Sequence, residues 1–500
     1  MNHEINRLIQ FALDKEMITK DECDYSVNLL LDLFDENDFE YEEINEHLPL
    51  ATPILEKMLD HAVTKGLIED NTTSRDLFDT KIMNCIMPRP HTVNEKFKQK
   101  YMVSPKVATD YYYKLSIASN YIRKSRTDKN IIWKKYVKYG NIEISINLSK
   151  PEKDPKEIAK AKLIKSSGYP KCLLCKENVG FSGDLNRAAR QTHRIIPIEL
   201  ATGNYYLQYS PYVYYNEHCI VFNGRHIPMK IEKETFVKLF DFVKMFPHYF
   251  LGSNADLPIV GGSILSHDHF QGGHYTFAMA KAPIEKYFKI KDFEDVETGI
   301  VYWPMSVLRT RSGNPDRLIE LGEKVLAAWR DYTDEAAFVF ARTEGEPHNT
   351  ITPIARRNGD MYELDLVLRN NITTEEFPLG VFHPHQELHH IKKENIGLIE
   401  VMGLAVLPSR LKDELALLGD YIVEGRDIRS CGELEKHAAW VEEFLPKYEA
   451  VTKENVEEVL KNEVGLVFER VLEDAGVYKC TEEGRAAFAR FLNSIGAGEV

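Results

Sequence analysis

The sequence is poor in cysteine and has no long apolar segment. Seven cysteines are spread over 500 residues, and only Cys172 and Cys175 lie close together. Such a sparse, odd-numbered set argues against a disulfide scaffold and favours a reducing compartment. No run reaches the roughly 18 apolar residues of a membrane-spanning helix, and MNHEINRLIQFALDKEMITK at the start lacks the apolar core of a signal peptide. We therefore expect a cytoplasmic protein without a membrane partner.

The sequence also lacks an excess of basic residues. Its formal net charge is -14 at pH 7, with 43% hydrophobic and 28% charged residues. An extended nucleic acid needs a basic protein face, so we expect no nucleic-acid partner. The composition is that of a globular protein with room for several domains. A small anionic substrate would need local basic groups against this acidic background.

The spacing of apolar residues divides the chain into helical and mixed regions. Residues 1–130 have helical spacing, as in DYSVNLLLDLFDEN, and contain no chemical motif. Further on, short runs such as IEISINL, HCIVFN, GGSILSHDHF, AAFVFAR and MYELDLVLR predict strands between helical stretches. This mixture predicts an α+β fold with a largely antiparallel sheet. Residues 411–500 return to helical spacing and predict a helical tail.

Cys172 and Cys175 form a CxxC motif directly after the turn signal SGYP. A turn brings both sulfurs to one side, where they can reach one metal ion. A redox pair of the thioredoxin type needs a helix that begins at the motif, and KENVGFSGDLN lacks helical spacing. There is no second CxxC, so two histidines must complete a zinc site; His226 and His267 are the candidates. The alternative is a pair of buried thiols and two surface histidines.

The segment SHDHFQGG carries the main catalytic candidates. On a strand, alternate side chains share one face, so His267, His269 and Gln271 would line the same side. One histidine can then bind a metal while the next faces a substrate as nucleophile or base. The amide of Gln271 can donate to a phosphate oxygen, and Gly272 and Gly273 allow a phosphate to approach the backbone. The alternative is a pair of metal ligands without a catalytic role.

A second histidine-rich segment, GVFHPHQELHH, contains His383, His385, His389 and His390. Glu387 stands two residues after His385, where the first segment has glutamine, and no glycine pair follows. A carboxylate among imidazoles suits a metal better than a phosphate. The alternative is a solvated histidine-rich turn.

Together these segments resemble the UDP-glucose–hexose-1-phosphate uridylyltransferases, the galactose-1-phosphate uridylyltransferase class typical of Gram-positive bacteria, within the histidine-triad superfamily. CLLCKENVGFSGDLN is similar to that family's CxxC segment, CIVFNGRHIP to its next zinc-ligand region, and SHDHFQGG to its HPHxQ strand, with aspartate in place of proline. The resemblance implies an α+β, histidine-triad-like antiparallel core. It also implies two related halves, residues 131–295 and 296–410, between the helical extension 1–130 and the tail 411–500.

The resemblance implies roles for individual residues. Cys172, Cys175, His226 and His267 would bind a structural zinc ion. His269 would be the nucleophile, and Gln271 would contact the transferred phosphoryl group. Substrate contacts are implied for Lys150, Lys153, Asn178, Asp184, Gly272 and Gly273, of which Asn178 and Asp184 would lie near the uridine. A second divalent metal is implied at Glu285, His348, His383 and His385.

The implied reaction is a ping-pong transfer in galactose metabolism. The histidine takes UMP from UDP-glucose, releases glucose 1-phosphate, and passes UMP to galactose 1-phosphate to form UDP-galactose. Positioning and charge stabilisation dominate such a transfer, and the family implies a homodimer. The hydrolase branch has a third histidine where this chain has Gln271, so glutamine favours transfer; His274 falls out of register. The alternatives are a nucleoside-polyphosphate phosphorylase of the same superfamily and a non-catalytic, zinc-stabilised binding protein.

Overall fold

The computed structural model describes residues 1–149, 168–200, 203–262 and 264–499. The predicted substrate residues Lys150 and Lys153 lie outside the described residues. The chain forms two compact units, which do not follow the predicted halves 131–295 and 296–410; those halves stay a prediction. Among the described residues, the first unit comprises Met1–Lys129, Ser149–Glu199 and Gly203–Ile227, and the second comprises Asn130–Leu148, Leu200–Thr202 and Pro228–Val500.

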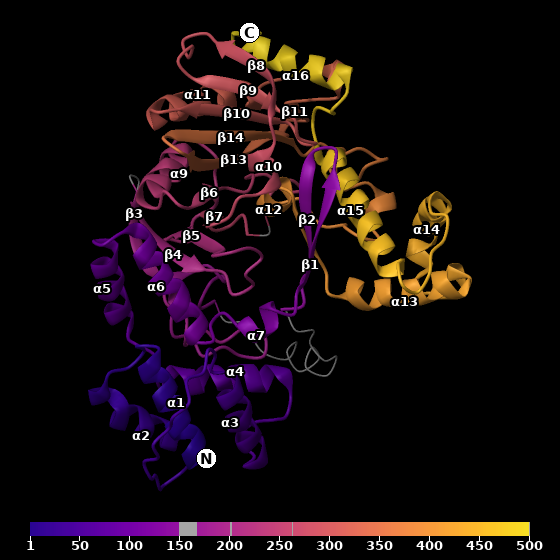
Figure 1. The fold of residues 1–500 in the computed structure, drawn as a ribbon. Coiled ribbons are helices and arrows are strands. Elements are labelled where there is room, and N and C mark those ends of the chain that lie inside the picture. Colours follow the sequence, from indigo (N-terminus) through magenta and orange to yellow (C-terminus); the bar gives the residue numbers. More distant parts are fainter. Residues whose placement is uncertain (150–167, 201–202, 263, 500) are drawn as a thin grey trace. The chain divides into compact units, whose positions relative to one another are not determined.

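The first unit begins with a bundle of helices (indigo to purple in Figure 1), as the helical spacing predicted. The helices pack through apolar faces, and Leu8, Leu30 and Ile54 from three of them are fully buried. Side-chain oxygens of Asn71 and Ser104 accept backbone N–H groups and so cap two of the helices. The helices are α1 (Asn2–Asp14), α2 (Cys23–Phe34), α3 (Thr52–Thr64), α4 (Thr72–Asn84), α5 (Pro90–Tyr101), α6 (Pro105–Ala118) and α7 (Lys124–Thr127).

Strands follow the helices in the first unit: β3 (Ile196–Leu200), β4 (Gly203–Tyr209) and β5 (Cys219–Asn223). Strands β4 and β5 pair antiparallel. Tyrosine hydroxyls join helix α6 to β4 and to the segment just before β3. The hydroxyl of Tyr112 donates to the carbonyl oxygen of Arg194 at 2.5 Å, and that of Tyr209 donates to the carbonyl oxygen of Thr109 at 3.1 Å. A bonded hydroxyl allows a large aromatic ring to be fully buried.

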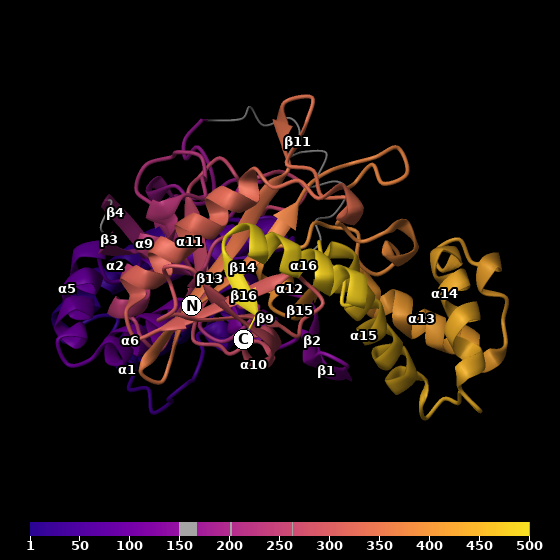
Figure 2. The same cartoon turned by 90° about the horizontal axis from the view of Figure 1, so that it is seen from above.

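The second unit contains an antiparallel sheet with two helices on one face. Helices α9 (Lys233–Met245) and α11 (Pro315–Arg330) pack side by side and contact β13 and β14 (Figures 1 and 2). Residues Phe236, Gly322 and Leu364 meet at this interface. In sheet order the strands are β16 (Ala497–Glu499), β8 (Ile284–Ile290), β9 (Glu297–Val301), β10 (Val307–Ser312), β14 (Met361–Asn370), β13 (Asn349–Asn358), β6 (Phe250–Gly252) and β7 (His269–Gly273).

A smaller sheet in the second unit joins distant parts of the chain. Strands β1 (Ile131–Val137) and β2 (Gly140–Ile146) form an antiparallel hairpin, and β15 (Leu404–Leu407) pairs parallel to β2. The C-terminal region is helical as predicted, except for β16. Its helices include α13 (Arg410–Glu424), α14 (Ala438–Phe444), α15 (Val456–Ala475) and α16 (Glu482–Ser494), and Figure 2 shows α13, α14 and α15 grouped together. No helix in the described part of the chain is long and apolar enough to cross a membrane.

Two predicted strands are wrong. In GGSILSHDHF, residues 265–266 form a turn and β7 begins only at His269. A Cβ on Gly261 would lie 2.5 Å from the carbonyl oxygen of Ala255, which shows a close loop crossing and no extended strand. In AAFVFAR, Glu335–Ala337 form a 3₁₀ turn, and Phe338 has a φ of 54°. This left-handed conformation interrupts an extended chain.

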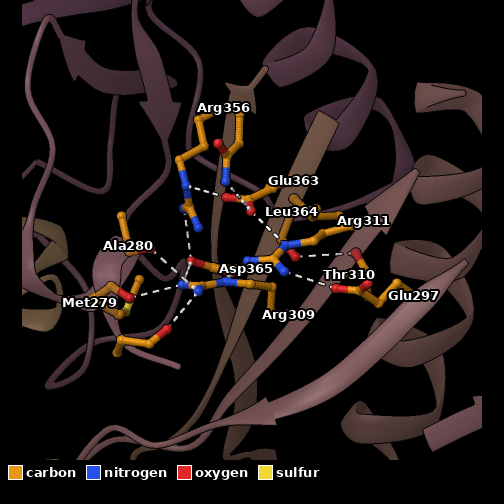
Figure 3. A network of polar contacts seen from close by, with 12 residues as sticks. Met279, Ala280, Glu297, Arg309, Thr310, Arg311, Arg356, Glu363, Leu364 and Asp365 are labelled. Atoms are coloured by element: carbon orange, nitrogen blue, oxygen red, sulfur yellow. Dashed lines mark hydrogen bonds and ion pairs between the residues drawn. The ribbon is translucent and has the colours of Figure 1, made fainter. Parts of the chain in front are cut away.

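The sheet face opposite α9 and α11 carries a row of paired charges (Figure 3). Alternate residues of a strand point to opposite faces, so Leu364 packs beneath α11 while Asp365 points to the other side. Arg309 of β10 binds both carboxylate oxygens of Asp365, at 2.7 and 3.0 Å. Arg356 of β13 binds Asp365 at 2.8 Å and Glu363 at 2.7 Å. These buried charges are therefore compensated within the sheet.

Candidate active site

His269 is the first residue of β7 and is buried. Its Nδ1 atom lies 2.7 Å from the carbonyl oxygen of His267. A carbonyl oxygen can only accept, so Nδ1 carries the proton and the lone pair resides on Nε2. Burial lowers the pKa of His269 below its usual value, which favours the neutral ring. A neutral imidazole with its lone pair on Nε2 is the nucleophilic form.

Gln271 points to the sheet face that carries the paired charges. Strand pairing places Gln271 opposite Gly252, Gly252 opposite Ile354, and Ile354 opposite Asp365. Residues that lie opposite one another in a sheet share a face. His269, two residues before Gln271, therefore points to that face as well. His267 lies before the strand, so strand alternation does not determine its direction.

Gly272, Gly273 and His274 complete this segment, and each of them contacts neighbouring residues of the fold. Gly272 and Gly273 are buried within β7, where they pair with Leu251 and Phe250 of β6. His274 follows the strand and stacks on the ring of Tyr249, with 6.2 Å between ring centroids.

Lys238 of helix α9 contacts two residues of the β7 segment, Asp268 and Phe270. The Nζ atom of Lys238 lies 3.3 Å from a carboxylate oxygen of Asp268 and 5.9 Å from the centre of the Phe270 ring. Lys238 and Asp268 are both buried. Asp268 precedes His269 directly, so this ion pair restrains the backbone that carries the histidine. The sequence alone did not reveal Lys238, because 30 residues separate it from Asp268.

Cys172, Cys175 and His226 come together in the first unit. Their donor atoms lie within 4.8 Å of one another. The two Sγ atoms are 3.6 Å apart, and Sγ of Cys175 lies 3.3 Å from Nδ1 of His226. Two sulfurs and an imidazole nitrogen form a donor set suited to zinc. His267, the predicted fourth ligand, belongs to the second unit.

Asn178 supports the CxxC turn. Its buried side-chain amide donates to the carbonyl oxygens of Cys172 and Cys175, at 2.8 Å each. Burial raises the pKa of the Cys172 thiol to about 11, so metal binding at neutral pH would release its proton. In the structure Asn178 supports the turn that carries Cys172 and Cys175, and its place near the uridine stays a prediction.

Asp184 borders a pocket of about 480 Å³ within the first unit. Its carboxylate accepts the backbone N–H groups of Asn186 and Arg187, and also the guanidinium of Arg187 at 2.5 and 2.9 Å. Arg190 also lines the pocket, with its guanidinium 5.6 Å from the centre of the Tyr121 ring. Arg123 and Arg126, which also line the pocket, pair with Asp76. Arg190 makes no ion pair within the described residues and can bind an anion. The sequence signal for Arg187 and Arg190 was the segment NRAAR, which begins two residues after Asp184.

Two residues predicted for a second metal have other partners. The carboxylate of Glu285 lies 2.5 Å from the guanidinium of Arg485 on α16. The ring of His348 lies between the hydroxyl of Thr343 at 2.5 Å and the amide oxygen of Asn371 at 2.8 Å. Within the described residues, these two side chains do not share a cluster of metal-binding donors.

The other two predicted ligands lie in the second histidine-rich segment. His383 is buried, with Nδ1 3.1 Å from the carbonyl oxygen of Pro384. His385 groups with Glu387 and Asp474, and their donor atoms lie within 4.8 Å of one another. Of the four residues predicted to bind a second metal, only His385 lies within a cluster of possible metal ligands in the described structure.

Comparison with known proteins identified two family models that match the chain in succession. The model for the N-terminal domain of galactose-1-phosphate uridyl transferase matches residues 16–228, and the model for the C-terminal domain matches residues 241–439. The first match begins just after α1 ends at Asp14, so most of the helical region belongs to the part that the family shares. The first match also ends beside Ile227, the last residue of the first unit.

Full-length relatives share about half of the residues. The chain is 58% identical over 496 residues to the galactose-1-phosphate uridylyltransferase of Clostridium acetobutylicum, covering 99% of this chain and 100% of that protein. It is 52% identical to the galactose-1-phosphate uridylyltransferase of Fusobacterium nucleatum, covering 98% of both chains. Among solved structures, yeast Ap4A phosphorylase matches 66% of this chain and 91% of its own, with 12% identity and a TM-score of 0.32.

Proposed function

Because the chain belongs to the galactose-1-phosphate uridylyltransferase family, we propose that it transfers a uridylyl group from UDP-glucose to galactose 1-phosphate through His269. Its substrates are a sugar nucleotide and a sugar phosphate, and it acts in galactose metabolism. The observation that supports His269 is the 2.7 Å contact of its Nδ1 atom with the His267 carbonyl oxygen. The family resemblance also leads us to propose a homodimer.

In the first half-reaction, Nε2 of His269 attacks the α-phosphorus of UDP-glucose. A nitrogen–phosphorus bond forms, the bond to the bridging oxygen breaks, and glucose 1-phosphate leaves with that electron pair. Positive charge develops on the imidazole, and the His267 carbonyl oxygen stabilises it through the proton on Nδ1. The leaving phosphate is already anionic near neutral pH, so no general acid is required.

In the second half-reaction, a phosphate oxygen of galactose 1-phosphate attacks the uridylyl-histidine. The nitrogen–phosphorus bond breaks and UDP-galactose is released, which returns His269 to its starting form. The neutral amide of Gln271 donates to a non-bridging oxygen in both steps without repelling the phosphate. The arginine-lined pocket beside Asp184 is proposed to bind an anionic part of the substrates.

We propose a structural zinc ion at Cys172, Cys175 and His226, with His267 as the fourth ligand. Three ligands lie together in the first unit, and a structural zinc site takes four. When bound, zinc would stabilise the fold of these loops. We do not propose a second metal ion at Glu285, His348, His383 and His385. The side chains of Glu285 and His348 have other partners.

The test is to trap the intermediate with UDP-glucose that carries a radioactive label in its uracil ring. We expect an acid-labile, base-stable label on the protein, released by galactose 1-phosphate. His269→Ala should abolish labelling, whereas His274→Ala, a matched variant five residues further on, should retain it. Labelling of His269→Ala at the normal rate would refute the proposal. A nucleoside-polyphosphate phosphorylase would be labelled by a dinucleoside polyphosphate instead, and a binding protein by neither.

A further inference from the structure

A pocket of about 520 Å³ lies in the C-terminal part of the second unit and contains none of the proposed transfer residues. Its walls come from the second histidine-rich segment, from α14 with the preceding 3₁₀ turn Glu435–His437, and from α15. The charged residues on these walls are Lys393, Lys436, Arg470, Glu387 and Glu443, and His390 and Trp440 are among the polar ones. The transfer chemistry gives this pocket no role.

Behind the pocket wall, Glu414, His437 and His390 form a buried relay. A carboxylate oxygen of Glu414 lies 3.1 Å from Nε2 of His437, and Nδ1 of His437 lies 2.9 Å from Nδ1 of His390. Lys436 and Arg410 bind the same carboxylate, at 2.5 and 2.6 Å. These two cations favour the ionised carboxylate and so an acceptor role for Glu414.

The relay determines where the protons lie on both rings. The carboxylate of Glu414 accepts, so Nε2 of His437 carries a proton. In the neutral ring, Nδ1 of His437 is then an acceptor, so the proton in the contact between the rings belongs to Nδ1 of His390. Burial lowers the pKa of His390 to about 3, which keeps that ring neutral. Nε2 of His390 is therefore a hydrogen-bond acceptor on a residue that lines the pocket.

Two buried side chains of the pocket wall have polar atoms without a partner in the described structure. One is Nε2 of His390, and the other is the indole N–H of Trp440; each side chain is only 7% exposed. Each of the other three tryptophans, Trp133, Trp303 and Trp329, donates its indole N–H to a backbone carbonyl oxygen. The centres of the two rings lie 5.0 Å apart, and an acceptor beside a donor is matched by a hydroxyl group, which can donate to one and accept from the other.

The pocket also has cations that can reach an anion. Lys393 is exposed and makes no ion pair within the described residues. The guanidinium of Arg470 has only long contacts with two carboxylates, 3.4 Å to Glu387 and 3.7 Å to Glu443. All of these acidic and basic side chains are solvated at the rim, so such contacts contribute little. A phosphate dianion would form stronger, charge-assisted bonds with the guanidinium.

We infer that this pocket is a second ligand site, which binds a phosphorylated sugar. A sugar hydroxyl donates to Nε2 of His390 and accepts from the indole of Trp440, while the phosphate binds Lys393 and Arg470. The site shares no residue with the proposed transfer chemistry, so its occupant is not a reactant in that step. The inference does not depend on the role of His269.

The experiment is a tryptophan-fluorescence titration of the full chain with glucose 6-phosphate. We expect a saturable change that is absent in Trp440→Phe, because the other three indoles lie elsewhere. The pair Lys393→Ala and Arg470→Ala removes exposed side chains only and should weaken binding at least about tenfold through lost charge-assisted bonds. The matched pair Lys412→Ala and Lys453→Ala, exposed and outside the pocket, should bind normally.

Four results would overturn the inference. The first is no saturable change at millimolar glucose 6-phosphate. The second is unaltered binding by the Lys393→Ala, Arg470→Ala protein. The third is inorganic phosphate binding as tightly as glucose 6-phosphate, which would show that no hydroxyl is recognised. Glucose without phosphate should bind more weakly than glucose 6-phosphate, and equal binding would refute the phosphate contacts.

Discussion

The ammonium group of Lys238 lies 3.3 Å from the carboxylate of Asp268, and both side chains are buried. This pair joins α9 to the residue that immediately precedes His269. The HPHxQ motif that this segment resembles has proline at the position of Asp268, and proline restrains the backbone through its ring. Here a side-chain ion pair to a neighbouring helix restrains the backbone.

Replacing one partner of this pair should destabilise the protein more than replacing both. Lys238→Met leaves a buried carboxylate without its cation, which costs about 3–5 kcal/mol of unfolding free energy. The double variant Lys238→Met, Asp268→Leu should recover most of that loss. Urea unfolding measures the free energy of unfolding of the single and the double variant. Lys244→Met, on the same helix but exposed and 4.0 Å from Asp241, should change stability by less than about 1 kcal/mol. Equal losses in the single and double variants would contradict the role given to the pair.

Asn178→Ala should weaken metal binding without removing a ligand. The variant loses the two hydrogen bonds that hold the carbonyl groups of Cys172 and Cys175 in place. Loss of such support around a metal site typically lowers affinity about 10–100-fold. Competition with a zinc chelator provides the measurement. Asn186→Ala, an exposed position in the same region, is the matched control, and equal affinities in the two variants would count against the proposed zinc site.

Gln271→Glu should impair transfer more than Gln271→Ala. Both variants lose the donor to the phosphoryl oxygen, a change of about 10²–10³ in rate for comparable donors. The glutamate adds repulsion between two anions, so its rate should be lower still. Single-turnover uridylylation by UDP-glucose separates this step from product release. Equal rates in the two variants would mean that residue 271 does not face the phosphate.

Protonation of Asp365 at acid pH should lower the free energy of unfolding. Burial alone would raise the pKa of this carboxyl, but the guanidinium groups of Arg309 and Arg356 outweigh burial and lower the pKa from 3.8 to about 2. The folded pKa is below the unfolded one, so this contribution is present above about pH 4 and is lost as the pH falls toward 2.

Urea unfolding at pH 5 and pH 3 tests this expectation. About 1 kcal/mol of the Asp365 contribution should disappear between these two pH values. Asp365→Asn should lower stability at both and reduce the pH dependence by that amount. Asp360→Asn, in the turn between β13 and β14, should keep the normal pH dependence. An unchanged pH dependence in Asp365→Asn would contradict the expectation.

The sequence predicted local features better than distant contacts. Helical and alternating spacing identified most elements, and CxxC and HxHxQ identified their candidate residues, because both depend on neighbours within a few positions. The predicted strand at AAFVFAR was wrong, because the apolar residues of this segment give no indication that Phe338 has a positive φ. The proton position on His269 depends on the direction of the His267 carbonyl, which no residue type specifies. The His390–His437 contact joins residues 47 positions apart, and nothing in their spacing indicates it.

The three-stranded sheet β1–β2–β15 has a consequence for the order of folding. The turn between β1 and β2 is short, so these two strands can pair at once. The parallel pairing of β2 with β15, in which Glu143 lies opposite Leu404, joins residues that are separated by most of the second unit. Closing so long a loop costs chain entropy before its contacts can form. The hairpin should therefore gain protection from hydrogen exchange early in refolding, while β15 gains it only late, after the larger sheet.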